Sequence, residues 1–138
     1  MSEHALPAAD AAVLQQMPGC EMIDLILPDL NGLLRGKRVT RDALGKIYEN
    51  GGIVSSVCHG AVGLLNITLS DGTLLIKGKK VTGFSDEEER LAQLDQYVPF
   101  LTEAELKKRG AAYRKAEKPW EAFAIADHRV ITGQNPAS

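Results

Sequence analysis

Two short runs of apolar residues near the front of the chain have the length of β-strands. They occupy residues 22–27 and 33–39, and the Asn31-Gly32 pair lies between them. Asn-Gly adopts a positive φ at little cost and is a preferred turn of a two-residue β-hairpin. The pattern therefore predicts a hairpin.

The preceding residues 1–20 are Ala-rich without a clear apolar stripe, so we expect a frayed or loosely docked start.

A helix is predicted to follow the hairpin. Thr40 can cap it, and Leu44, Ile47 and Tyr48 fall at the i, i+3 and i+4 positions that together form one apolar face. Gly51 can end the helix in the left-handed conformation, which glycine adopts without the steric cost of a Cβ atom. The helix is then expected to lead directly into a strand.

That strand is rich in β-branched residues, and it ends abruptly at a possible catalytic turn. It spans residues 53–57, Cys58-His59-Gly60 follows, and residues 61–65 then resume as a helix. A helix, a strand, a sharp turn and a second helix in succession are typical of α/β proteins.

Two further strand pairs are predicted downstream. Residues 74–76 and 79–82 flank a Lys-Gly turn as a small hairpin, and residues 123–126 and 129–132 form a final pair around an Asp-His turn.

Two capping boxes lie between these strand pairs. Ser85 with Glu88 is expected to open one helix, and Thr102 with Glu105 is expected to open another. Gly110 is placed to end the second helix. Each box would satisfy backbone N–H groups that the first helical turn leaves without partners.

The composition fits an ordinary globular domain. The 138 residues are 44% hydrophobic and 25% charged, and 16 Lys and Arg nearly balance 18 Asp and Glu.

No apolar run approaches the roughly 18 to 20 residues needed to cross a bilayer, and acidic Glu3 stands where a secretion signal would be basic. Two cysteines, Cys20 and Cys58, are too few for a disulfide scaffold. We expect a cytoplasmic protein that binds neither nucleic acid nor membrane.

Cys58 has the local setting of a nucleophile. A thiol between a strand and a helix lies near the unpaired N–H groups of the first helical turn, which favour the thiolate and can hold an oxyanion. The backbone amides of His59 and Gly60 are the candidates for that oxyanion site, and the His59 side chain could move protons. The alternative interpretation of Cys58 is a small thiol buried in the core.

Four ordered runs within residues 46–138 make this site more specific. They are GGIVSSVCHGAVGLLN, DGTLLIKGKKVTGFSDEEE, PFLTEAELKKRGA and WEAFAIADHRVITGQNPAS. Together they resemble PfpI-type proteins of the glyoxalase III and heat-shock chaperone branch, a class I glutamine amidotransferase-like family. The resemblance implies a nucleophile elbow at Cys58 that works with His59 and Glu89. The alternative for Glu89 is an exposed carboxylate on a helix face.

The same resemblance implies a larger domain than residues 46–138 supply. The family's domain begins with strands and helices upstream of the elbow, and that half carries a glutamate that contacts the cysteine and transfers protons. Half of a flavodoxin-like sheet leaves strand edges and apolar faces uncovered. We therefore expect a homodimer or a larger assembly that completes the sheet.

The front of the chain resembles a different family. The run MIDLILPDLNGLLRGKRVTRDALGKIYENG begins at Met22. It is similar to the N-terminal β-grasp region of glutamine synthetases, especially the γ-glutamylpolyamine synthetase branch. The ATP site, metal-binding glutamates and large barrel of those enzymes have no counterpart in this sequence, so synthetase activity is not expected. We interpret the chain as a recombinant of two families that meet near KIYENGG.

No metal or other cofactor is expected. The candidate ligands have neither zinc-finger spacing nor helical i, i+4 spacing, and they are His4, Cys20, Cys58, His59, Asp127 and His128. Trp120, next to Pro119, is interpreted as a packing residue.

These observations predict a mixed α/β fold in one merged folding unit. A flexible or loosely helical start (1–20) precedes a synthetase-like hairpin and helix (21–50) and a PfpI-like half-domain (51–138) with a half flavodoxin-like sheet. The leading function is a weak cysteine-dependent glyoxalase acting on a small carbonyl compound such as methylglyoxal. Two alternatives stay open: a folded chimera without catalytic function, and a promiscuous hydrolase that uses a newly acquired metal site or a pocket between two copies.

Overall fold

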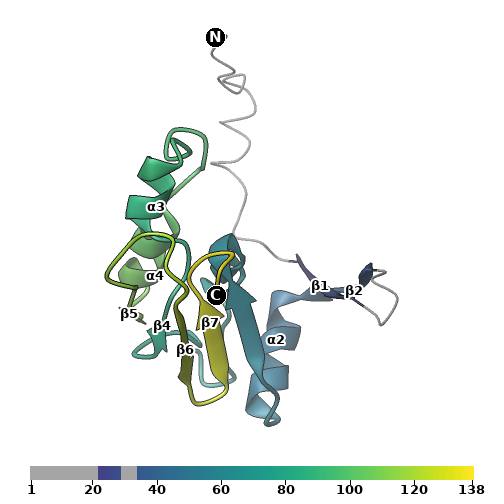
Figure 1. Cartoon of the computed structure of the whole chain (residues 1–138). Helices are drawn as coiled ribbons and strands as arrows, with labels where there is room; N and C mark the ends of the chain where they lie inside the picture. Colours follow the sequence, from purple (N-terminus) through teal and green to yellow (C-terminus); the bar gives the residue numbers. More distant parts are fainter. Residues whose placement is uncertain (1–21, 29–33) are drawn as a thin grey trace.

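The computed structural model describes residues 22–28 and 34–138 (Figure 1). The predicted front hairpin is confirmed: β1 (Met22–Pro28) pairs antiparallel with β2 (Leu34–Thr40), from Met22 opposite Thr40 to Pro28 opposite Leu34. The Asn31-Gly32 turn and residues 1–20 lie outside the described residues.

The predicted first helix is also confirmed as α2 (Arg41–Glu49). Thr40 occupies the N-cap position, but its side chain makes no capping hydrogen bond. Gly51 has a φ of 88°, the left-handed conformation expected at the end of the helix. Leu44 is buried, whereas Ile47 is exposed, so the helix buries less of its apolar face than its spacing predicts.

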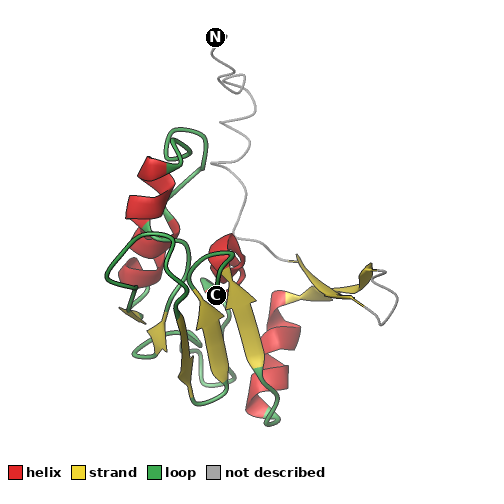
Figure 2. Cartoon of the chain, in the orientation of Figure 1, coloured by secondary structure: helices red, strands yellow, loops and turns green. Residues whose placement is uncertain are grey.

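The central sheet has three strands in the order β3-β7-β6 (Figure 2). β3 (Val54–Val57) runs parallel to β7 (Val130–Gly133), and β6 (Ala124–Asp127) pairs antiparallel with β7. These strands confirm the predicted strand before Cys58 and the predicted final strand pair. Because β3 is at the edge of the sheet, its outer backbone edge pairs with no other strand of the described residues.

The structure differs from the prediction directly after β3. Instead of a turn followed by a helix over residues 61–65, a 3-10 helix, η1 (Cys58–Leu64), begins at the cysteine itself. Cys58 has a φ of 59°, and this left-handed residue reverses the chain in a single step. The helix can therefore start without an intervening turn.

The predicted hairpin of residues 74–76 with 79–82 is wrong. β4 (Lys80–Val81) instead pairs in parallel with β5 (Ala112–Tyr113), and Leu74 forms an isolated bridge with Thr68. Gly78, with a φ of 75°, donates its N–H to the carbonyl oxygen of Gly110 at 2.8 Å. This long-range contact brings the two short strands together, and local sequence carries no signal for it.

One of the two predicted capping boxes is confirmed. α3 (Asp86–Leu91) is capped by Ser85, which exchanges hydrogen bonds with Glu88 as expected. α4 (Thr102–Lys108) has Leu101 at its N-cap without a side-chain cap, so the predicted box of Thr102 with Glu105 is wrong. Thr102 is buried inside the first turn, and Glu105 bonds instead to Arg109 one turn on. Gly110, with a φ of 82°, follows the end of this helix as predicted.

The core lies on one face of the three-stranded sheet. Val54 and Val130 are paired in register, and both are buried in this core. Ile53, which precedes β3, is 62% exposed. Val57 and Ile131 are exposed as well, so the opposite face of the sheet is open and partly apolar. The result is the predicted mixed α/β fold. The core cluster comprises Leu44, Val54, Ala61, Leu64, Leu65, Ile67, Leu75, Ile76, Val81, Leu106, Tyr113 and Val130.

Candidate active site

Cys58 stands at a strained turn between a strand and a helix. It follows β3 directly, begins η1 and has a positive φ of 59°. A residue with a Cβ atom adopts this conformation only when its surroundings impose it, and such strain concentrates at functional sites. A strand, a strained residue and a helix in succession have the geometry of a nucleophile elbow, which presents a side chain above the end of a sheet.

The structure brings Cys58, His59 and Glu89 into one hydrogen-bonded chain. The Sγ atom of Cys58 lies 3.4 Å from Nδ1 of His59, and Nε2 of His59 lies 2.7 Å from Oε2 of Glu89. Adjacent residues need not face each other, but the 3-10 turn that begins at Cys58 allows these two side chains to meet. The imidazole can accept a proton from the thiol while Glu89 stabilises the imidazolium.

Glu89 is buried, so its interpretation as an exposed helix-face carboxylate is wrong. Its side chain is 1% exposed in the first turn of α3. Oε2 bonds to His59, while Oε1 has no hydrogen-bond partner among residues 22–28 and 34–138. A buried carboxylate with an unpaired oxygen costs stability, and such groups in native structures commonly serve a functional role.

The pKa of the Cys58 thiol is shifted in the direction opposite to the one that the helix and His59 were expected to produce. Burial, followed by the nearby carboxylates of Glu88 and Glu89, raises the pKa of the Cys58 thiol above its ordinary value. The backbone N–H of His59 acts in the opposite direction and does not outweigh them. The raised pKa favours the neutral thiol, so a neighbouring base such as His59 would be needed to form the thiolate.

The first turn of η1 offers N–H groups for an oxyanion. His59 and Gly60 occupy this turn, whose amides have no acceptor within the helix. A Cβ atom placed on Gly60 would meet only the Cβ of Ser56, at 3.9 Å. The space next to the Cα atom of Gly60 is therefore open.

Two aromatic residues near the site were missed by the sequence interpretation. The ring of Phe84 lies 4.3 Å from that of His59, and the ring of Trp120 lies 5.6 Å from that of Phe84, between centroids. Trp120 therefore packs on Phe84, as its interpretation as a packing residue implies, but 48% of it stays exposed. Local sequence could not reveal this arrangement, because Phe84 and Trp120 come from separate loops.

The described residues contain no group of three or more His, Cys, Asp and Glu side chains placed to hold a metal ion. His128 and Asp127 lie in the turn between β6 and β7, with His128 Nε2 3.8 Å from Asp127 Oδ1. His4 and Cys20 fall outside the part of the chain that the structure describes. Across this same part, no helix combines the length and the apolar character that crossing a membrane requires.

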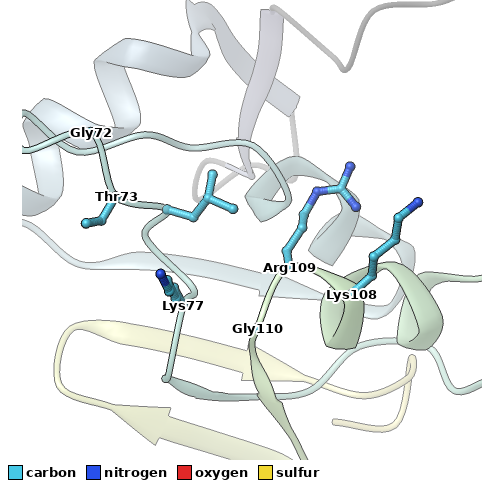
Figure 3. Close-up of a pocket in the computed structure, with 7 residues that line it drawn as sticks. Gly72, Thr73, Lys77, Lys108, Arg109 and Gly110 are labelled. Carbon is cyan, nitrogen blue, oxygen red and sulfur yellow. The ribbon is translucent and has the colours of Figure 1, made fainter.

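A cavity of about 540 Å³ lies elsewhere on the molecule, beside the end of α4 (Figure 3). Two of the positively charged side chains that line this cavity, Lys108 and Arg109, form ion pairs with Glu105. None of the three hydrogen-bonded residues of the elbow lines it, so this cavity is distinct from the candidate active site. Its lining consists of Gly72, Thr73, Leu74, Lys77, Lys108, Arg109 and Gly110.

The C-terminal part of the chain is similar in sequence to known glyoxalases. No family model matches the chain. The glutathione-independent glyoxalase HSP31 of Saccharomyces cerevisiae is 39% identical over 103 residues, which cover 71% of this chain and 44% of that protein. The match lies in the C-terminal part of the chain, which is thus similar to the PfpI/DJ-1 glyoxalase III family.

Solved structures agree with this similarity. Glyoxalase III from Candida albicans superposes with a TM-score of 0.63 at 35% identity, covering 70% of this chain and 43% of that one. The rapid encystment protein of Francisella tularensis gives a TM-score of 0.67 at 36% identity, covering 70% and 43%. The chain spans less than half the length of the curated relatives it matches.

Proposed function

We propose that this chain carries a cysteine-dependent site of the glyoxalase III type, which acts on small 2-oxoaldehydes such as methylglyoxal. The observation that carries the proposal is the hydrogen-bonded chain from Cys58 through His59 to Glu89 at a strained elbow. The relatives' names, glutathione-independent glyoxalase and glyoxalase III, support the reaction class. Cys58 is a free thiol, as the chemistry requires, and a reducing cytoplasm would keep it so.

The first step is addition of the thiol to the aldehyde. The Cys58 proton passes to Nδ1 of His59, 3.4 Å away, while Sγ bonds to the aldehyde carbon. The electron pair of the carbonyl bond moves to its oxygen, which the amides of His59 and Gly60 can receive. Glu89 stabilises the imidazolium, which can return its proton to that oxygen and leave a hemithioacetal.

The later steps need a second proton-transfer group. A proton must move from the former aldehyde carbon to the neighbouring carbonyl carbon to give a thioester, which water hydrolyses to the 2-hydroxy acid and free thiol. The family resemblance assigns this transfer to a glutamate upstream of the elbow. Beside Cys58, Glu88 accepts hydrogen bonds from Trp120 and Asn135, and Oε2 of Glu89 is bonded to His59, so neither carboxylate is free to replace that glutamate without losing a contact. We therefore expect slow turnover.

Methylglyoxal consumption tests the proposal. The wild-type protein should turn over about two to four orders of magnitude more slowly than a homologue that carries the upstream glutamate, the usual cost of losing a positioned acid or base. Cys58→Ala should abolish the residual activity, and Ser55→Ala on the exposed face of β3 should preserve it. Activity that survives in Cys58→Ala would locate the chemistry elsewhere, and homologue-level turnover would contradict the expected loss.

We propose further that residues 22–50 derive from a glutamine-synthetase-like segment joined to the glyoxalase-like part. Its support is the sequence resemblance that begins at Met22, together with an antiparallel hairpin that leads into a helix. A crossover near KIYENGG would preserve a helix that runs into a strand. If residues 22–50 align with the upstream half of glyoxalases at least as well as they align with glutamine synthetases, this origin is refuted.

A further inference from the structure

Glu88 is a buried side chain beside the site, and the proposed chemistry does not use it. Its Oε2 accepts hydrogen bonds from the N–H and the hydroxyl of Ser85, at 3.1 and 2.9 Å. Its Oε1 accepts from Nδ2 of Asn135 at 2.8 Å and from the N–H of Trp120 at 2.9 Å. Burial would raise the pKa of Glu88, but these hydrogen bonds outweigh it and lower the pKa. The lowered pKa favours the ionised carboxylate, which four donors surround.

These contacts hold Trp120 in an unfavourable backbone conformation. Its φ is 66°, which a bulky side chain adopts only under constraint. The same Asn135 amide donates to the carbonyl oxygen of Glu121 at 2.9 Å, and Oε1 of Gln134 accepts from the N–H of Ala116 at 2.8 Å. The loop is therefore fixed before and after Trp120.

The fixed ring continues an aromatic row that begins at the catalytic histidine candidate. Phe84 packs on His59 with an interplanar angle of 34°, and Trp120 packs on Phe84 at 57°. Phe84 is buried, whereas nearly half of Trp120 is exposed. The row thus ends in an accessible indole that is separated from His59 by one ring.

We propose that Trp120 is a specificity-determining wall of the Cys58 site and that Glu88 is the residue that positions it. The site would then favour 2-oxoaldehydes that carry an aryl substituent, such as phenylglyoxal, over methylglyoxal. When the aldehyde carbon is at Sγ, the substituent on the second carbonyl projects away from the sulfur, and an aryl group there can pack against the indole. Contacts of this kind change rates by about threefold to tenfold. This inference rests on the proposed role of Cys58 as the nucleophile.

A pair of thiol reagents tests the wall without requiring turnover. N-phenylmaleimide and N-ethylmaleimide differ in the aryl group, and mass spectrometry of the Cys58 peptide separates this thiol from Cys20. The ratio of phenyl to ethyl rates should exceed that of free N-acetylcysteine and should fall about threefold to tenfold in Trp120→Ala. Trp120→Phe should retain most of the preference. Tyr97→Ala, which removes another exposed aromatic, should leave the ratio unchanged.

The positioning role of Glu88 has its own readout, because Trp120 is the single tryptophan in the sequence. Glu88→Gln should shift the indole emission to longer wavelength and lower the maleimide ratio, while cooperative unfolding shows that the fold persists. Glu87→Gln, a neighbouring exposed carboxylate paired with Lys115, is the matched control and should change neither. Unchanged emission and ratio in Glu88→Gln would overturn the positioning role.

The two proposals fail in different ways. Equal maleimide ratios in wild type and Trp120→Ala would overturn the wall, even if Cys58 turned over methylglyoxal. If turnover is measurable, kcat/KM for phenylglyoxal should fall more in Trp120→Ala than kcat/KM for methylglyoxal, and equal losses would also count against the wall. Absence of Cys58-dependent turnover of either aldehyde would remove the proposed function, while the maleimide ratio would still report on the wall.

Discussion

Nε2 of His59 lies 2.7 Å from Oε2 of Glu89, although the two residues are 30 positions apart in the sequence. His59 is half-buried at the elbow, and Glu89 is enclosed in the first turn of α3. The position of α3 therefore determines the orientation of the imidazole beside Cys58. This contact gives the first prediction.

Glu89→Gln should lower Cys58-dependent turnover of methylglyoxal about tenfold. The amide can still accept a hydrogen bond from His59, but it cannot stabilise the imidazolium as a carboxylate does. A charge-assisted hydrogen bond is stronger by roughly 1.4 kcal/mol, which is equivalent to a factor of ten in rate. Steady-state kinetics provide the measurement. Glu87→Gln, on the exposed side of the same helix, should behave as wild type; a comparable loss in that variant would point to a general effect on α3.

Alkylation of Cys58 by iodoacetamide should show a higher apparent pKa than alkylation of a cysteine in a short unstructured peptide. Burial and the carboxylates of Glu88 and Glu89 raise the pKa of the folded thiol, so the protonated form is favoured and the rate continues to rise at alkaline pH. Peptide mass spectrometry resolves Cys58 from Cys20. A profile at or below that of the peptide thiol would instead indicate a resting thiolate.

Acid should destabilise the wild-type protein more than Glu88→Gln. The pKa of Glu88 is lowered in the folded state, so its contribution is present above the unfolded value of about 4.3 and is lost as the pH falls through the folded value. The variant should be roughly 2–4 kcal/mol less stable near neutral pH, because four donors lose a charged acceptor. Urea unfolding at a series of pH values measures the free energy of unfolding of the wild type and of Glu88→Gln. Equal losses of stability in the two proteins as the pH falls would contradict the prediction.

We propose that the open face and the edge of the central sheet mediate self-association. Ile53, Val57 and Ile131 are exposed there, and β3 has an unpaired outer edge among the described strands. Exposed strand edges and apolar patches favour pairing with another chain. Light scattering should give a mass of at least twice 14.9 kDa, and Ile131→Lys should reduce it. A monomer mass at micromolar concentration would rule out a stable dimer.

Features with a local signal could be predicted from the sequence. The hairpin of β1 and β2, the left-handed Gly51 and the box of Ser85 with Glu88 each follow from residues within a few positions of one another. The family resemblance suggested Glu89, which spacing alone could not distinguish from a solvent-exposed helix residue.

Features that depend on distant contacts could not be predicted in this way. The two-residue pairing of β4 with β5 has too little sequence pattern to detect. The raised pKa of Cys58 depends on burial and on carboxylates from α3, which the local motif does not contain. The place of Trp120 beside Phe84 depends on hydrogen bonds from Glu88, a residue that the sequence identified only as part of a helix cap.

The parallel pairing of β3 with β7 also has a consequence for the order of folding. It joins Val54 to Val130, so most of the glyoxalase-like part must be synthesised and its ends brought together before the sheet can form. Closing so long a loop is slow, and helices and tight turns form well before it. During biosynthesis Cys58 would therefore be an ordinary solvent-exposed thiol until β7 docks. The nascent chain would pass through a period in which electrophiles can modify its cysteine without the selectivity of the finished site.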